Sequence, residues 1–101
     1  MRALYYTTTA RRDLGEISLY IADESGSFDV ANAVIDKIDR YCGRLASLPG
    51  TLGSARSDLQ IGLRSTPCQG YVIFFRYGLN SLEIISILHG SRDVVAYFDE
   101  G

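Results

Sequence analysis

The stretch YVIFFRYGLNSLEIISILH, residues 71–89, contains two apolar runs separated by the three residues 78–80. Both runs are rich in β-branched and aromatic residues, which favour strands. The break between them contains glycine and asparagine and has the length of a hairpin turn. The stretch therefore predicts an antiparallel pair of strands, Tyr71–Tyr77 and Ser81–His89.

Two amphipathic helices are predicted upstream of this hairpin. Apolar residues recur every three or four positions from residue 10 to 21 and again from residue 31 to 48, which is the spacing of one helical face. Residues 24–27 separate the two helices, and Thr9 is a candidate cap for the first. Pro49 ends the second helix because proline disfavours helical geometry in the residue before it.

Further short elements complete the predicted fold. Residues 3–7 alternate as a first strand, residues 51–58 are a polar loop, and residues 59–65 are a third candidate strand, joined to the hairpin by the turn 66–70. Residues 93–99 add a terminal turn or helix. The fold class is therefore α+β, in the order β-α-α-β-β-β, with the helical hairpin on one face of an antiparallel sheet.

The composition restricts the class of protein. A chain of 101 residues is expected to form one domain over 1–101, and 47% apolar residues with 22% charged ones are typical of a globular chain. Ten basic and twelve acidic residues give a net charge of −2, which does not favour sequence-independent nucleic-acid binding. Neither a membrane span nor a secretory signal is expected, and Cys42 and Cys68 are interpreted as buried or neutral thiols in a reducing cytoplasm.

Alternation along the strands divides their side chains between two faces of the sheet. The predicted core face, covered by the helices, contains Ile61, Leu63, Tyr71, Ile73, Phe75, Tyr77, Leu82, Ile84, Ser86 and Leu88. The opposite face contains Gln60, Gly62, Arg64, Val72, Phe74, Arg76, Glu83, Ile85, Ile87 and His89. Two helices cover only one face, so the apolar patch on the other needs a cover. Either a partner or the chain's own C-terminal segment, with Val94, Val95, Tyr97 and Phe98, supplies it.

Few residues offer chemistry. The single histidine and the two cysteines have no metal-ligand spacing, and no phosphate-binding loop is present, so no metal or cofactor is expected. A polar cluster remains, namely Arg64, Arg76, Glu83, His89 and Arg92. It can be catalytic, with arginine stabilising charge and His89 moving protons. It can equally be structural, with Arg76 and Glu83 forming a cross-strand ion pair.

The segments Gly62-Leu63-Arg64-Ser65 and Leu88-His89-Gly90-Ser91-Arg92-Asp93, with the hairpin between them, resemble the ParE toxins of the RelE/ParE superfamily. The resemblance implies a bacterial type II toxin that inhibits DNA gyrase, and so replication, without being an enzyme. It also implies a ParD-like antitoxin, which carries a ribbon-helix-helix DNA-binding domain and a tail that wraps the toxin. Operator DNA is then bound only through the antitoxin.

This resemblance and the face assignment together give two sets of candidate residues. The antitoxin-binding set is Leu14, Ile21, Arg64, Val72, Phe74, Arg76, Ile85 and Ile87. The target-binding set is His89, Arg92, Tyr97 and Phe98.

Two alternatives stay open at this point. In the ribosome-dependent mRNA endoribonuclease branch, RelE and YoeB, the catalytic roles would map to Arg64, Arg76, His89 and Tyr97. The low isoelectric point, about 5.2, and the acidic C-terminus disfavour that branch. An inactive toxin, retained for autoregulation, is the other alternative.

Overall fold

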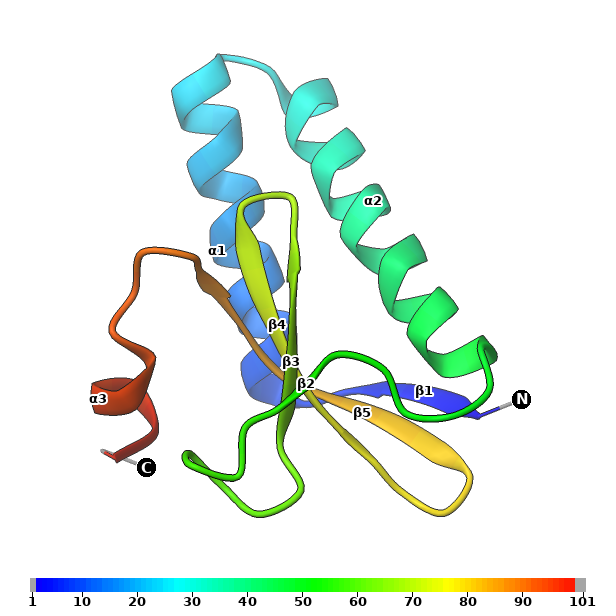
Figure 1. The fold of residues 1–101 in the computed structure, drawn as a ribbon. Coiled ribbons are helices and arrows are strands. Elements are labelled where there is room, and N and C mark those ends of the chain that lie inside the picture. Colours follow the sequence, from blue (N-terminus) through cyan, green and yellow to red (C-terminus); the bar gives the residue numbers. More distant parts are fainter. Residues whose placement is uncertain (1, 100–101) are drawn as a thin grey trace.

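In the computed structural model, which describes residues 2–99, a five-stranded sheet carries two long helices on one face and a short helix on the other (Figure 1). The strands lie in the order β1-β5-β4-β3-β2. The elements are β1 (Ala3–Tyr6), α1 (Thr8–Ser25), α2 (Phe28–Ser47), β2 (Ser54–Ala55), β3 (Arg64–Cys68), β4 (Tyr71–Tyr77), β5 (Ser81–His89) and α3 (Val94–Asp99). None of the helices in this range is long and apolar enough to cross a membrane.

The hairpin of β4 and β5 has the predicted bounds and forms the centre of the sheet. The backbone N–H of Gly78 donates to the C=O of Ser81 at 2.9 Å, which closes the predicted turn. β1 pairs with β5 in parallel, from Ala3 opposite Ser81 to Tyr6 opposite Ile84. A parallel pair requires a crossover, and the α1–α2 hairpin provides it.

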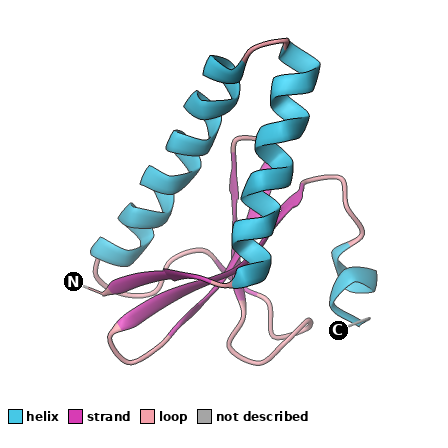
Figure 2. Cartoon of the chain, turned by 180° about the vertical axis from the view of Figure 1, so that it is seen from behind, coloured by secondary structure: helices cyan, strands magenta, loops and turns pink. Residues whose placement is uncertain are grey.

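Both long helices begin at side-chain caps and end at sharp changes of backbone direction. Thr7, not Thr9, caps α1, because its hydroxyl accepts from the N–H of Ala10 at 3.0 Å and Thr9 already lies inside the helix. Gly26 ends α1 with a left-handed φ of 70°, and Ser27 caps α2. The two helices lean side by side over the sheet, and α3 stands apart from them (Figure 2).

The strand predicted over residues 59–65 is displaced toward the C-terminus. Residues 59–62 form turns and a bend, and Ile61 is 92% exposed instead of lying in the core. β3 instead runs through Pro67, which has no backbone N–H to donate. β2 pairs with β3 only at Arg64 and Ser65, so at Pro67 no hydrogen bond between these two strands is lost. The connection to β4 shrinks to Gln69 and Gly70, both with positive φ, as a tight two-residue hairpin turn requires.

A bulge in β5 overturns part of the predicted face assignment. Phe75 lies opposite Ile84 and Phe74 opposite Ser86, so Ile85 is the extra residue and the alternation changes phase after it. Ile87 and His89 therefore share the α1–α2 side of the sheet with their partners Ile73 and Tyr71. Ser86 and Leu88 lie on the other side.

The assignment of β3 is also reversed. Arg64 lies opposite Phe75 on the α1–α2 side, and Leu63 belongs to the cluster on the opposite side. The alternation of apolar residues could not show on which face of the sheet each residue of β3 lies, because the predicted strand included residues that form turns instead.

The apolar patch on the second face is covered by the chain itself. Leu63, Phe74 and Leu88 form a buried cluster there, and the side chains of α3, Tyr97 and Phe98 among them, pack against it. The Phe74 and Phe98 rings meet edge to face with centroids 5.0 Å apart. Of the two covers considered from the sequence, the structure contains the C-terminal segment.

Candidate functional site

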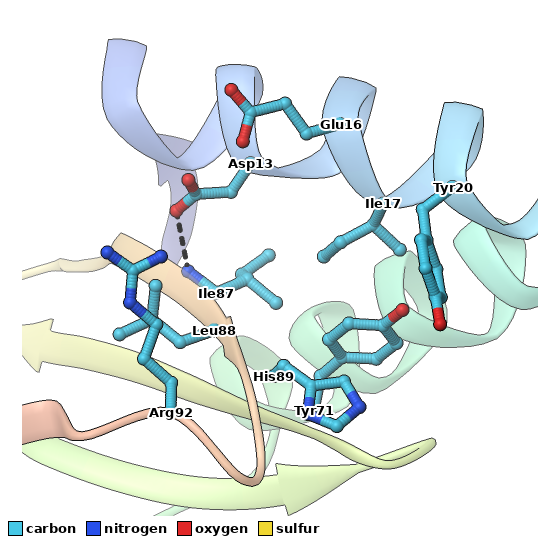
Figure 3. Close-up of a pocket in the computed structure, with 9 residues that line it drawn as sticks. All are labelled: Asp13, Glu16, Ile17, Tyr20, Tyr71, Ile87, Leu88, His89 and Arg92. Atoms are coloured by element: carbon cyan, nitrogen blue, oxygen red, sulfur yellow. Dashed lines mark hydrogen bonds between the residues drawn. The ribbon is translucent and has the colours of Figure 1, made fainter.

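A cleft of about 370 Å³ opens between α1 and the C-terminal half of β5 (Figure 3). Its floor is apolar, formed by Ile17 and Ile87, and α1 contributes polar side chains along one wall. The whole lining consists of Asp13, Glu16, Ile17, Tyr20, Tyr71, Ile87, Leu88, His89 and Arg92. We call this the α1–β5 cleft.

Asp13 holds the two walls of the α1–β5 cleft together. Its carboxylate accepts from the backbone N–H of Ile87 and from the hydroxyl of Ser86, both at 2.9 Å. β1 ends opposite Ile84, so the N–H of Ile87, three residues further along β5, has no strand on that side to bond. The carboxylate replaces the missing strand, and hydrogen bonds to a charged acceptor are stronger than neutral ones.

Aromatic side chains line the outer part of the α1–β5 cleft. Tyr20 is 57% exposed and faces Tyr71, and the Tyr71 and His89 rings meet edge to face at 5.6 Å. Burial, followed by the nearby Tyr20 phenol, raises the pKa of Tyr71, so its hydroxyl stays protonated. His89 Nδ1 lies 2.7 Å from the hydroxyl of Ser91, which fixes the imidazole in place.

A second hollow, of about 410 Å³, lies between β5 and α3. Arg92 lines both this hollow and the α1–β5 cleft, and its guanidinium stacks 5.0 Å from the Tyr97 ring centre. Tyr97 and Phe98 also line it, and the Tyr97 hydroxyl lies 3.2 Å from that of Ser86. Of the predicted target-binding residues, His89 therefore lines the α1–β5 cleft, Tyr97 and Phe98 line the second hollow, and Arg92 lies between the two.

The four residues mapped to ribonuclease roles do not converge. Arg64 donates to the C=O groups of Leu52 and Gly53, on the α1–α2 side. Arg76 points to the other side of the sheet and donates to Gln60. Among residues 2–99 its predicted ion pair with Glu83 is not formed, although the two residues are cross-strand neighbours.

His89 lies far from Arg76 along the sheet and on the opposite side of it from Tyr97. His89 is opposite Tyr71, five residues along β4 from Arg76, which is about 17 Å in a strand. Tyr97 lies over the α3 side of the sheet.

The predicted antitoxin-binding set is split between the two faces of the sheet. Leu14, Ile21, Arg64 and Ile87 lie on the α1–α2 side, whereas Val72, Phe74, Arg76 and Ile85 lie on the α3 side. Phe74 and Ile87 are buried, so neither offers its side chain to a partner unless the fold opens. The assumption that these residues form one exposed groove is wrong.

Sequence reasoning missed most of the α1–β5 cleft. Asp13, Glu16 and Tyr20 occur at spacings of three and four, which places them on one face of a helix, and that signal was available. Nothing in the sequence indicates that these three residues lie next to Tyr71, because that proximity depends on the parallel pairing of β1 with β5. Within residues 2–99, no group of three His, Cys, Asp or Glu side chains could hold a metal ion. Cys42 is buried, as predicted.

Comparison with known proteins decides the family. Residues 4–94 match the model for the ParE toxin of type II toxin–antitoxin systems, parDE. The chain belongs to the ParE toxin family. The resemblance seen in residues 62–65 and 88–93 is thereby confirmed, and the protein is a ParE-type toxin of a type II system. Residue 94, the last one matched, is the first residue of α3.

Two relatives of this ParE-type toxin agree with the assignment. Toxin ParE3 of Caulobacter vibrioides is 32% identical over 73 residues, which are 72% of each chain. A solved structure described as the chromosomal ParDE TA system from P. aeruginosa matches with a TM-score of 0.76 and 20% identity. That match covers 88% of this chain and 96% of the other, and it confirms the α+β fold.

Proposed function

We propose that this ParE-type toxin acts by binding DNA gyrase in the cytoplasm, which blocks replication, and that it catalyses no covalent step itself. We further propose that a ParD-like antitoxin neutralises it and carries the contact with operator DNA. The family assignment over residues 4–94 and the fold shared with a ParDE system support both halves of the proposal.

The observation that carries the non-catalytic half is the separation of the basic residues. An RNA-cleaving site must gather its acid, base and charge-stabilising groups within hydrogen-bond reach of one scissile phosphate. Arg64 and Arg76 point to opposite sides of the sheet and bind neighbouring loops. His89, which pairs with Tyr71, lies about 17 Å from Arg76 as measured along β4. Such a set does not support general acid–base catalysis.

The antitoxin is best accommodated by the α1–β5 cleft. This cleft combines an apolar floor at Ile17 and Ile87 with the exposed aromatic side chain of Tyr20. Large apolar or aromatic side chains at such openings are typical anchors for a bound segment. The α3 side of the sheet is a poorer candidate, because a partner there would first have to displace Phe98 from Phe74.

The test is a pair of assays on purified, antitoxin-free protein. Supercoiling by gyrase should be inhibited, and adding the antitoxin should restore it. Ribosome-dependent cleavage of mRNA that Arg64→Ala or His89→Ala abolishes would contradict the proposal and favour the RelE branch. A toxin that leaves both gyrase activity and mRNA intact, but still forms a complex with the antitoxin, would contradict an active poison. That result would favour an inactive toxin retained for autoregulation.

A further inference from the structure

The edge of β5 beyond the end of β1 presents two backbone groups to the α1–β5 cleft. β1 pairs with β5 only as far as Ile84, and the hydroxyl of Thr7 then bonds the C=O of Ile85 at 2.7 Å. From Ile87 to His89 this edge has no strand neighbour among residues 2–99.

The existing hydrogen bonds show which groups on this edge are occupied. The N–H of Ile87 is bonded to Asp13, so Ile87 and, two residues further, His89 direct their backbone groups away from β4. The N–H of Gly90, the next residue, instead bonds the C=O of Gly70 on the β4 side, which agrees with this alternation of backbone directions. The C=O of His89 accepts from the N–H of Arg92 at 3.0 Å. The C=O of Ile87 and the N–H of His89 remain without a partner in the described part of the chain.

These two remaining groups favour one strand direction. A parallel neighbour uses the C=O of one residue and the N–H of the residue two further on, with a single partner residue bonded to both. An antiparallel neighbour uses the N–H and the C=O of the same residue in each bonded pair. Ile87 and His89 each have only one of these free, so an antiparallel segment would leave two of its own polar groups unbonded. Buried groups left in this way are costly.

The surroundings of the edge define the side chains that the segment would carry. The partner residue opposite Leu88 would point toward the α3 side, and its two neighbours would point into the cleft, toward Ile17 and Tyr20. The charged residues that line the cleft are Asp13, Glu16 and Arg92, and the helical wall over residues 13–25 adds Asp23 and Glu24 and no lysine or arginine. Charge complementarity therefore favours a segment with apolar and basic side chains.

We propose that the α1–β5 cleft binds an extended, basic and apolar segment of the antitoxin as a strand parallel to β5, bonded to the C=O of Ile87 and the N–H of His89. The inference rests on the proposed function, since it specifies the conformation, direction and charge of the neutralising segment. β-strand addition of this kind supplies affinity through main-chain bonds and specificity through alternate side chains.

The test is amide hydrogen exchange by NMR on the toxin, free and in complex with its antitoxin. Exchange of the His89 amide should slow at least tenfold in the complex, whereas the amide of Leu79, in the exposed turn at the other end of the hairpin, should be unaffected. Interstrand NOEs around Leu88 should have the parallel pattern. Glu16→Lys should weaken the complex about tenfold, and the matched change Asp36→Lys, on α2 outside the cleft, should change affinity less than twofold.

The possible failures are distinct. A complex that forms with an unchanged His89 amide, with antiparallel NOEs, or with equal effects of the two charge reversals would overturn this inference and leave the proposed function standing. If no antitoxin binds the folded chain at all, the neutralisation half of the proposed function is overturned, and this inference with it.

Discussion

At the scale of single residues, Asp13 is the side chain on which the α1–β5 cleft most depends. One carboxylate joins the first turns of α1 to the backbone of β5 and to Ser86, where no strand is available to do so. Helix and strand are thereby held at a fixed separation. The cleft is a consequence of a short first strand.

Asp13→Ala should lower the free energy of unfolding by about 2–3 kcal/mol, because two hydrogen bonds to a charged acceptor are lost and the N–H of Ile87 is left unbonded. Urea denaturation followed by circular dichroism measures the change. The control is Glu16→Ala, one turn further along α1, which should cost less than about 0.5 kcal/mol at its exposed position. Equal losses in the two variants would refute this role.

A buried thiol makes the protein sensitive to alkaline pH. Burial raises the pKa of Cys42 from its ordinary value of 9.0 to about 12. Burial and the hydrogen bond to Asp39 likewise raise the pKa of Tyr6, whose ordinary value is 10.0. In both cases the folded chain prefers the neutral form. The contribution of Cys42 to stability is complete below pH 9 and is lost as the pH rises from 9 to 12, and that of Tyr6 begins to be lost only above pH 10.

The free energy of unfolding should therefore fall steadily above pH 9, and Cys42→Ala should flatten the decline between pH 9 and 10. The substitution also leaves a cavity, which lowers stability at every pH without changing the slope. Urea titrations at pH 7, 8, 9 and 10 separate the two effects. A wild-type slope in the variant would contradict this account.

At the scale of elements, α3 shields the second face of the sheet. The Phe98 ring meets the Phe74 ring edge to face, and the Tyr97 hydroxyl lies 3.2 Å from that of Ser86. The contact belongs to a six-residue helix with no buried residue of its own, so its stability comes from packing and not from helix propensity.

Phe98→Ala should cost about 1–2 kcal/mol, because it removes a partly buried aromatic contact and exposes the Phe74 ring to water. Binding of a fluorescent dye to apolar surface should rise, and proteolysis after residue 92 should accelerate. Val95→Ala, on the exposed side of the same helix, serves as the control and should change neither signal. Unaltered proteolysis of Phe98→Ala would show that α3 is held by other contacts.

The elements that could be predicted from sequence are those fixed by local signals. The hairpin of β4 and β5 follows from alternation and turn residues, and its bounds were predicted correctly. The helical spacing predicted α2 to residue 48, one residue beyond its end at Ser47. The bulge at Ile85 could not be predicted, because it depends on pairing across the sheet and reverses the face of every residue after it. The displaced β3 has the same cause, since Pro67 is tolerated only where the neighbouring strand has ended.

The candidate site was less predictable than the fold for a related reason. Its residues come from α1 and from two strands, and only the α1 members share a sequence spacing. The predicted antitoxin-binding set depended on one uninterrupted alternation, so the bulge divided it between two faces. The target-binding set follows the chain from His89 to Phe98 but is also divided, with His89 in the α1–β5 cleft and Tyr97 and Phe98 at the second hollow.

At the scale of the whole molecule, charge is segregated despite a net value of only −2. Residues 13–36 carry six acidic and no basic side chains, whereas residues 37–92 carry seven basic and three acidic ones. Several of these arginines already bind loop carbonyls or side chains, as Arg64 and Arg76 do. These two arginines therefore support the fold.

We propose that the toxin acts by occupying its target and not by turnover. Titration of purified gyrase, at a concentration well above the dissociation constant, with increasing amounts of the toxin measures this directly. We predict that loss of supercoiling grows in proportion to added toxin and reaches its limit near one toxin per binding site on the enzyme. Complete inactivation by a small fraction of one equivalent, increasing with time, would be catalysis and would contradict the claim.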